Sequence, residues 1–399
     1  MLNCRSIPAL YYHRVNLTDR RMAVSPERFA DQMETLARKG WQAIGAAQLL
    51  KFLKGEDIGR RKPFLITFDD GYFDNWFYAY PVLARTEMKA LIFLVSDWVR
   101  SGGAPRPNGP AAESPPVRDL DHAIKAALQN DFADFLSAEE VREMAAGGLV
   151  EFGSHGSSHS PCFASRRIRE FLFSSSTHWT KTVLANGDLR PGVPIFEWAS
   201  ALTVPRFYPQ VEFKERVVSQ VGHQIAEMPA KDRRARKELE RTFRYWSEKI
   251  RGGGPAGDYE TPAAAEARIQ TDLESSRRKI EALTGAPCPA LCWPWGQHSR
   301  LGVAAALKAG FELAFTTRTG AVCRGDDSFR LDRLRVSGQT TGRQLEMMMS
   351  AVARPTAARL VRRFSRSGST DHFFKDNPSG SMMDERSIEG PTGVRGEKR

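Results

Sequence analysis

The sequence has little cysteine and no long apolar segment. Five cysteines in 399 residues are too few for a disulfide-stapled scaffold, and the odd count favours a reducing compartment. The longest strongly apolar run, residues 91–95, is far shorter than the roughly 20 residues that a membrane-spanning helix needs. The first residues also lack the apolar stretch and small-residue cleavage site of a secretory signal. We therefore expect a soluble protein in the cytoplasm.

Acidic residues are outnumbered by basic ones, 47 against 58, which gives a formal net charge of +11. Residues 161–260 hold 17 basic and 12 acidic residues, and residues 354–399 hold 10 and 6, so these two segments carry most of the excess. Such a charge makes an anionic partner worth considering. Because it lies in peripheral segments without a recognisable nucleic-acid motif, we expect no specific nucleic-acid ligand.

What the sequence does contain is enough apolar material for a core, since 41% of its residues are hydrophobic. Short apolar runs suited to buried strands begin near residues 7, 64, 90, 149, 290, 314 and 334. Helical segments separate them: Ser25 and Pro26 open one, residues 137–140 form a capping box, and an apolar stripe from about residue 263 stops at Gly285. This alternation predicts an α/β fold, a parallel sheet or barrel with its site at the strand carboxyl ends.

Two segments interrupt the alternation. Residues 99–135 are rich in Gly and Pro before a short helical piece, and residues 161–262 read as a large, mainly helical insertion. We thus expect one barrel domain over residues 1–340 with these two inserts. A C-terminal helix and basic tail follow over residues 341–399, and the Gly, Ser and Arg content of the tail predicts mobility.

Three short motifs follow predicted strands. The sequence T-F-D-D-G places Asp69 and Asp70 side by side, where their mutual repulsion calls for a nearby cation. His155 and His159 are four residues apart, so both imidazoles can reach one metal ion if the chain turns helically. Residues 293–296, W-P-W-G, could wall a sugar-sized cleft and offer a backbone N–H to a developing oxyanion.

Each motif alone has a plainer explanation. The aspartates could belong to an acidic turn, the histidines to the surface, and the tryptophans to the core. Because the acidic pair and the histidine pair both follow strands of one predicted sheet, together they favour a hydrolytic metal site with open coordination positions.

Taken in order, the motifs resemble those of the polysaccharide deacetylase family, metal-dependent carbohydrate esterases with a NodB homology domain. T-F-D-D-G resembles the family's first motif, H-x-x-x-H its second and W-P-W-G its third, and residues 10–15 and 25–29 resemble the start of a common bacterial branch. The resemblance covers roughly residues 7–98, 136–160 and 263–340. It implies a distorted (β/α) barrel and removal of N-acetyl groups from amino sugars of a glycan or glycolipid, such as a surface polysaccharide or lipopolysaccharide precursor.

The resemblance also implies roles for individual residues. Asp69 would be the general base for the attacking water, and the backbone N–H of Trp295 would stabilise the oxyanion. The metal would be a divalent ion, most simply Zn²⁺, with Co²⁺, Ni²⁺, Fe²⁺ or Mn²⁺ as alternatives. The implied binding residues are Asp70, His155 and His159 for the metal, and Trp293, Trp295 and Gly296 for the substrate.

The sequence departs from the family at two places. Cys292 stands where the third motif often carries an arginine that orients the base, and Arg333 stands where the fifth motif often has a proton-donating histidine. Arginine is too basic to donate a proton near neutral pH, but Arg333 could hold Asp69 in place. His13 and His298 are then candidates for the acid, and either could be structural. These departures keep open a second hypothesis, a carbohydrate-binding protein without turnover.

The basic insertion raises the question of membrane contact. Leu239, Phe243, Trp246 and Ile250 form an apolar stripe on a basic predicted helix, which could meet anionic lipid beside a sugar cleft. The plainer alternative is a helical cap whose stripe packs on the barrel. We expect an N-acetylated glycan or glycolipid as the substrate, and peripheral membrane association only if the stripe is exposed.

Overall fold

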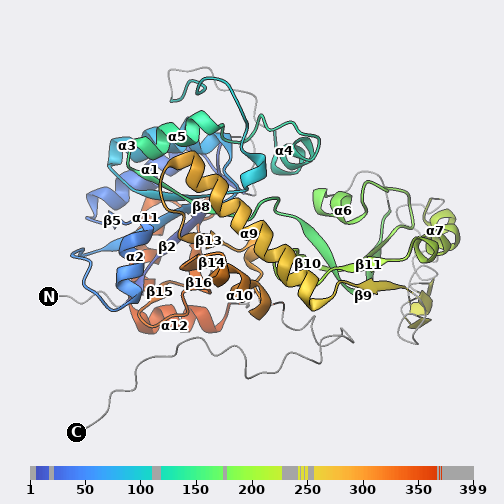
Figure 1. Ribbon diagram of the computed structural model, residues 1–399. Coiled ribbons are helices and arrows are strands. Elements are labelled where there is room, and N and C mark those ends of the chain that lie inside the picture. Colours follow the sequence, from blue (N-terminus) through green and yellow to red (C-terminus); the bar gives the residue numbers. More distant parts are fainter. Residues whose placement is uncertain are drawn as a thin grey trace, which may run out of the picture.

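A computed structural model describes residues 6–17, 22–109, 118–173, 178–226, 241–242, 244–246, 248–249, 256–365, 368 and 370. The body of the protein is a closed barrel of parallel strands surrounded by helices (Figure 1). The strands follow one another in the order β2–β16–β14–β13–β8–β7–β6 and return to β2. Their bounds are β2 Ala9–Tyr12, β6 Pro63–Phe68, β7 Ala90–Leu94, β8 Val150–Ser154, β13 Ala290–Cys292, β14 Leu313–Thr319 and β16 Leu331–Arg335. The predicted α/β barrel is confirmed.

The barrel strands are apolar on both faces because both faces are covered. One set of alternate residues forms the inner core, in which the rings of Phe93 and Phe315 lie 5.5 Å apart. Leu49 and Phe52 of helix α2 (Ala46–Leu53) join this inner cluster. The other set packs against the surrounding helices.

The helices begin and end where the sequence signals predict. The Ser25 side chain accepts a hydrogen bond from the Arg28 amide, Ser137 and Glu140 form the capping box, and Gly285 ends the long helix with a φ of 68°. Around the barrel lie α1 Pro26–Arg38, α3 Tyr80–Thr86, α5 Ala138–Ala146, α9 Pro262–Thr284, α10 Arg300–Lys308, α11 Gly342–Val352 and α12 Pro355–Arg363. Shorter elements are β1 Ser6–Ile7, β3 Arg14–Val15, β4 Ala23–Val24, β5 Gln42–Ala43, β15 Val322–Cys323, η1 Asn75–Ala79, η2 Ser96–Trp98 and η3 Pro294–Gly296.

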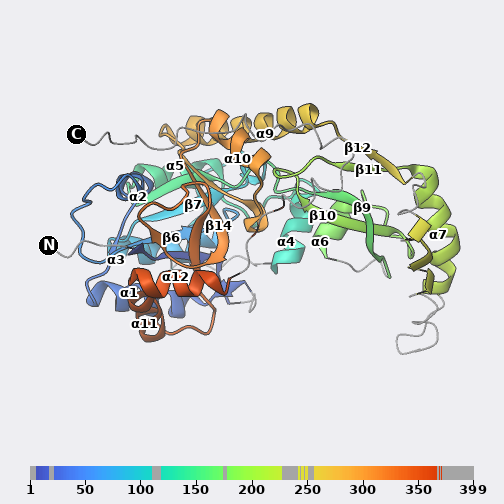
Figure 2. The same cartoon turned by 90° about the horizontal axis from the view of Figure 1, so that it is seen from below.

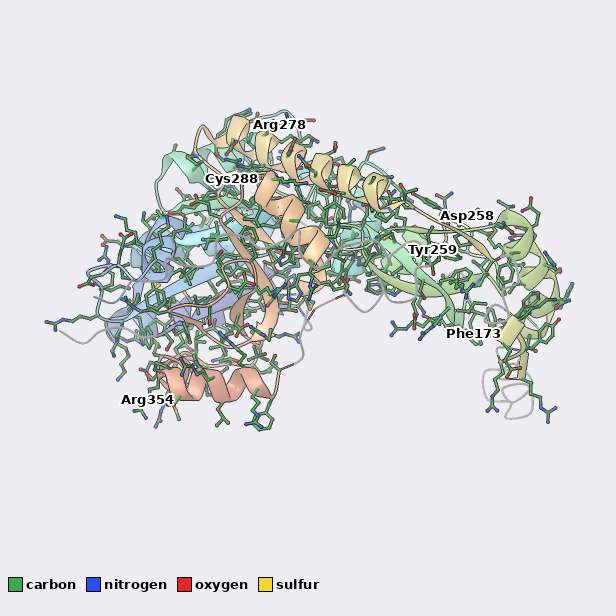
Figure 3. All side chains as sticks on the ribbon, turned by 60° about the horizontal axis from the view of Figure 1, so that its bottom comes forward. Phe173, Asp258, Tyr259, Arg278, Cys288 and Arg354 are labelled. Carbon is green, nitrogen blue, oxygen red and sulfur yellow. The ribbon has the colours of Figure 1, made fainter. Side chains whose placement is uncertain are left out.

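The second insert projects from one side of the barrel (Figures 1 and 2). Among its described residues, α6 Trp179–Leu184, α7 Val211–Ala226 and parts of 241–249 are helical. Its base is an antiparallel pair, β9 Pro161–Phe171 with β10 Pro194–Ser200. A second pair, β11 Phe207–Pro209 with β12 Gly257–Tyr259, leads back toward α9, and Figure 3 labels Asp258 and Tyr259 there. The insertion, expected to be mainly helical, therefore also contains strands that the sequence did not indicate. The first insert contributes α4 Leu120–Ala127.

The apolar stripe of the insertion is not exposed where the structure describes it. Trp246 is 1% exposed and packs edge-on against Phe213 of α7, with ring centroids 5.3 Å apart. Leu239, Phe243 and Ile250 lie outside the described residues. At Trp246 the stripe is packed, as in the plainer alternative, but its partner is α7 of the insertion and not the barrel. Among the described helices, none combines the length and the apolar character needed to cross a bilayer.

The C-terminal helices are fixed to the barrel by polar contacts. Ser6 at the start of β1 donates its hydroxyl to the carbonyls of Val352 and Ala353. Arg362 of α12 pairs with Asp326 at 2.5 Å and with the fully buried Asp332. The predicted mobile tail beyond residue 370 lies outside the described residues.

Candidate metal centre and catalytic site

Most of the predicted site residues gather at the carboxyl edge of the barrel. Asp69 and Asp70 follow β6, His13 follows β2, and His155 follows β8. Arg333 lies within β16. Because parallel strands present their carboxyl ends at the same edge, residues distant in sequence meet there. Residues of the first two motifs, together with His13 and Arg333, thereby form one polar cluster inside an otherwise apolar barrel.

The three predicted metal ligands face one another. Oδ1 of Asp70 lies 3.4 Å from Nε2 of His155 and 3.8 Å from Nε2 of His159. All three ligand atoms lie within 4.8 Å of one another. Nδ1 of His155 lies 2.8 Å from the carbonyl oxygen of Cys292, which can only accept, so Nδ1 carries the proton and Nε2 keeps its lone pair. Two imidazoles and a carboxylate in this arrangement fit a divalent metal ion.

The backbone at these positions is unusual. Asp70, His159 and Trp295 all have positive φ angles, of 75°, 48° and 55°. Non-glycine residues held in this region cost of order 1–3 kcal/mol each, and such strain is concentrated at functional sites. The loop between the histidines is tied to α9, because the Ser157 amide donates to Oδ1 of Asp272 at 2.8 Å.

The electrostatics of the ligands favour a cation. Burial, and next the charge of Asp69, raise the pKa of Asp70 to about 8. Burial lowers the pKa values of His155 and His159, so both imidazoles are neutral at pH 7 and can act as ligands. A divalent cation would offset the repulsion between the two adjacent carboxylates.

Asp69 is held by Arg333. The two guanidinium nitrogens Nη1 and Nη2 donate to the two carboxylate oxygens at 2.7 and 2.8 Å. Arg333 also donates to the Thr316 carbonyl at 2.9 Å and to the Cys292 sulfur at 3.1 Å. Although burial acts to raise it, this guanidinium holds the pKa of Asp69 well below its usual range. The predicted base therefore has an arginine partner despite Cys292 in the third motif, and the departure alone gives no support for loss of turnover.

The two candidate acids differ in their surroundings. Burial lowers the pKa of His13 to about 4, against the opposing effect of the Asp69 charge, so its ring is neutral at pH 7. His298 is buried, and its backbone pairs with that of Gly368 and Thr370. The role of either histidine as the acid stays a prediction.

The third motif divides into a core residue and a site residue. Trp293 is fully buried and donates its indole N–H to the Phe329 carbonyl at 2.9 Å, so it cannot contact substrate, and its predicted binding role is wrong. Trp295 is half-buried, and its ring lies 4.3 Å from that of His159. Gly296 has a φ of 68° and allows the turn to approach Thr317, which a Cβ would meet at 2.2 Å.

Three further tryptophans lie close to His159 or Trp295, and none of them was among the predicted site residues. The ring of Trp98 lies 5.9 Å from that of His159, and the rings of Trp179 and Trp198 lie 5.8 and 5.3 Å from that of Trp295. Trp98 closes the short helix after β7, so its place just past a strand could have signalled it. Trp179 and Trp198 belong to the insertion. The expectation that site residues follow the carboxyl ends of barrel strands does not apply there.

The chain is similar to known polysaccharide deacetylases. The family model described as polysaccharide deacetylase matches residues 57–186. A candidate polysaccharide deacetylase of Bacillus subtilis, YxkH, is 36% identical over 89 residues, which are 22% of this chain and 32% of that protein. The poly-β-1,6-N-acetyl-D-glucosamine N-deacetylase of Escherichia coli K12 is 26% identical over 150 residues, 37% of this chain and 20% of that protein. The matches thus span a third or less of these relatives.

The fold comparison extends further along the chain. The solved structure of a de-N-acetylase from Aggregatibacter actinomycetemcomitans superimposes with a TM-score of 0.51, over 86% of this chain and 98% of that one. The sequences are 17% identical, so this likeness concerns the fold. Together with the family match, it confirms the resemblance read from the motifs.

Proposed function

We propose that the protein, whose barrel resembles that of the polysaccharide deacetylases, is a metal-dependent hydrolase that removes N-acetyl groups from amino sugars of a glycan or glycolipid. One observation carries the proposal: the Asp69–Arg333 pair stands beside the convergent Asp70, His155 and His159 at the mouth of the barrel. Supporting it, the E. coli relative is named for N-deacetylation of an N-acetylglucosamine polymer.

Amide hydrolysis at this site needs a base, a metal and a source of protons for the amine. A divalent ion held by Asp70, His155 and His159, with Zn²⁺ the first choice, would supply Lewis-acid assistance to the carbonyl and an activated water. Asp69, kept ionised and oriented by Arg333, accepts a proton from the attacking water. The Trp295 backbone N–H is our candidate donor to the developing oxyanion.

The proton must then reach the leaving amine. Protonated Asp69 is a strong acid because Arg333 lowers its pKa, so it gives up its proton readily. His13 is neutral at pH 7 and can take up that proton. In this scheme His13 then passes the proton to the amine nitrogen as the C–N bond breaks. Acetic acid leaves with the oxygen and the second proton of the water, and it ionises to acetate in solution.

The test is amine release. Purified protein, loaded with Zn²⁺ or Co²⁺, is incubated with a panel of N-acetylated oligosaccharides and glycolipids, and its bound metal is measured in parallel. We expect metal-dependent release of free amine and acetate in equal amounts, with none from the Asp69→Asn variant. Release from no N-acetylhexosamine substrate, despite bound metal, would contradict the proposal.

A further inference from the structure

Helix α12 lies on the outside of the barrel (Figure 1), and the side that it turns to solvent carries apolar residues. Leu360 is 59% exposed, and Phe364, which caps the carboxyl end of the helix, is 82% exposed. Phe364 is the most exposed large hydrophobic side chain in the part of the chain that the structure describes. Residues four apart are neighbours on a helix surface, so Leu360 and Phe364 form one apolar strip.

Arginines line the same side of the helix. Arg359 and Arg363 are exposed and directly precede Leu360 and Phe364, and Arg354 is exposed just before the helix (Figure 3). α12 contains no acidic residue, and among the described residues none of these three arginines is paired with a carboxylate. The helix dipole explains a basic residue in the last turn, but it does not explain the apolar residues beside it. We call Arg354, Arg359, Leu360, Arg363 and Phe364 the α12 face.

The other side of α12 is fixed to the barrel. Arg362 pairs with Asp326 and with the fully buried Asp332, which lies within β16. Ala358 is 1% exposed and belongs to the core between the barrel and its helices. The α12 face is therefore presented on a packed helix, so a partner that binds it need not first order the backbone.

The carboxyl end of α12 lies near the mouth of the barrel. Ser365 follows Phe364, and its hydroxyl accepts a hydrogen bond at 2.8 Å from the amide of Thr319, the last residue of β14. Three residues further, the Gly368 carbonyl accepts a hydrogen bond from the amide of His298, just past the third motif. Four residues of chain span at most about 14 Å, so Phe364 lies within that distance of Gly368.

We propose that the α12 face binds the surface of a lipid bilayer that contains anionic phospholipid. Leu360 and Phe364 enter the headgroup region, and the guanidinium groups donate hydrogen bonds to lipid phosphates. Each arginine near such a surface raises the affinity roughly fivefold. A docked protein holds the mouth of the barrel close to the bilayer, where a glycolipid presents its sugar. This consequence rests on the proposed function, whereas docking itself does not.

Other partners fit the α12 face less well. A nucleic acid or an anionic glycan would pair with the arginines but would leave Leu360 and Phe364 in water. A second copy of the chain, joined through the same face, would bring its own arginines against these and be repelled. An anionic bilayer offers phosphates and an apolar interior to the same surface.

The experiment is sedimentation of the full chain with vesicles of phosphatidylcholine, prepared with and without phosphatidylglycerol. We expect binding only to the vesicles that contain phosphatidylglycerol, and this binding should weaken as salt is added. Leu360→Ser combined with Phe364→Ser should lower the partition coefficient by about tenfold, because apolar insertion is lost. Arg359→Gln combined with Arg363→Gln should lower it by roughly 25-fold, about fivefold for each arginine.

The matched control combines Leu307→Ser with Arg216→Gln. Leu307 is 54% exposed on α10, on the opposite side of the barrel from α12 (Figure 2), and Arg216 is exposed on α7. This variant should bind the vesicles like the unchanged chain. Equal binding by the α12-face variants and the control, or no binding to anionic vesicles at low salt, overturns the proposal.

Two further outcomes are informative. Self-association that Phe364→Ser abolishes, without vesicle binding, assigns the α12 face to a second copy and also overturns the proposal. Amine release from a soluble N-acetylated oligosaccharide tests the proposed reaction separately. Vesicle binding that depends on the α12 face, without amine release from any substrate, supports the docking surface and contradicts the reaction.

Discussion

Arg333 of β16 and Asp69, which follows β6, form a bidentate ion pair across the mouth of the barrel, although β16 and β6 are not neighbouring strands. β2 lies between β16 and β6, and the guanidinium passes over the ring of Tyr11 on β2 at 4.3 Å from its centroid. Both partners are almost fully buried. The pair therefore connects three strands at the point where the proposed base must be held.

Replacing Arg333 by Met should leave Asp69 as a buried carboxylate without its partner. Removing one member of a buried pair costs about 3–5 kcal/mol, so the free energy of unfolding should fall by that amount. The pKa of Asp69 should rise, and turnover should fall at least tenfold while bound zinc is retained. Denaturant unfolding, metal analysis and amine release measure the three effects. Arg335→Met, an exposed position two residues further, is the control, and equal losses in both variants would refute the role of the pair.

Substitutions of the proposed metal ligands and of the proposed base should affect bound metal and turnover differently. His155→Ala or His159→Ala removes one of three protein ligands, so metal and activity should be lost together with little change in stability. Asp69→Asn should keep the metal and abolish turnover. His122→Ala, at an exposed histidine on α4, should change neither. Loss of metal from Asp69→Asn but not from Asp70→Asn would exchange the two assigned roles.

Zinc affinity should depend on pH through Asp70. In the metal-free protein its pKa is about 8, raised by burial and then by the Asp69 charge, and only the ionised carboxylate binds a cation. Affinity should therefore be constant above about pH 8 and fall roughly tenfold per unit as the pH drops below it, with one proton released per ion bound. Calorimetry in buffers of different ionisation enthalpy counts that proton. In Asp69→Asn the fall should begin at lower pH, and an unchanged pH dependence would contradict the coupling.

Substitutions of Trp293 and Trp295 should have different effects on stability and on KM, although the two residues are only two positions apart. Trp293→Ala leaves a cavity in the core, which costs about 3–5 kcal/mol of stability. Trp295→Gly should keep the fold, since glycine adopts the positive φ of this position without strain, and should raise KM for glycan substrates. Thermal unfolding and steady-state kinetics on the two variants provide the comparison. A large stability loss in Trp295→Gly would mean that its ring is structural.

The predictable part of the site lies next to strands that are easily recognised. Every residue of β6 is buried, so its run of apolar residues stands out in the sequence and locates Asp69 and Asp70 just beyond it. The roles of the two tryptophans were not predictable in this way. β13 ends just before Trp293, and the chain then turns at Trp295, which has a positive φ. Along a strand, successive side chains point to opposite faces of the sheet, but this rule cannot be extended from Trp293 to Trp295.

The insertion was less predictable because its pairing is not local. β9 carries Arg166, Arg167 and Arg169, which do not suggest a strand, and it pairs with β10 across a helix and with shifts of register. The stripe containing Trp246 was read correctly as apolar, but the sequence does not show that its partner is α7 of the same insertion. The boundary expected at residue 340 stays a prediction.

The closure of the barrel has a consequence for how the chain is synthesised. Leu10 of β2 pairs on one side with Ile66 of β6, and on the other with Leu334 of β16, which is synthesised after all the other barrel strands. Until then one edge of β2 has no barrel strand beside it, and pairing across such a long separation in sequence is expected to be slow. β9 and β10 pair with each other and need no later strand, so the insertion can fold during that interval. His155 and His159, the proposed metal ligands, are thus synthesised well before Arg333, the partner of the proposed base.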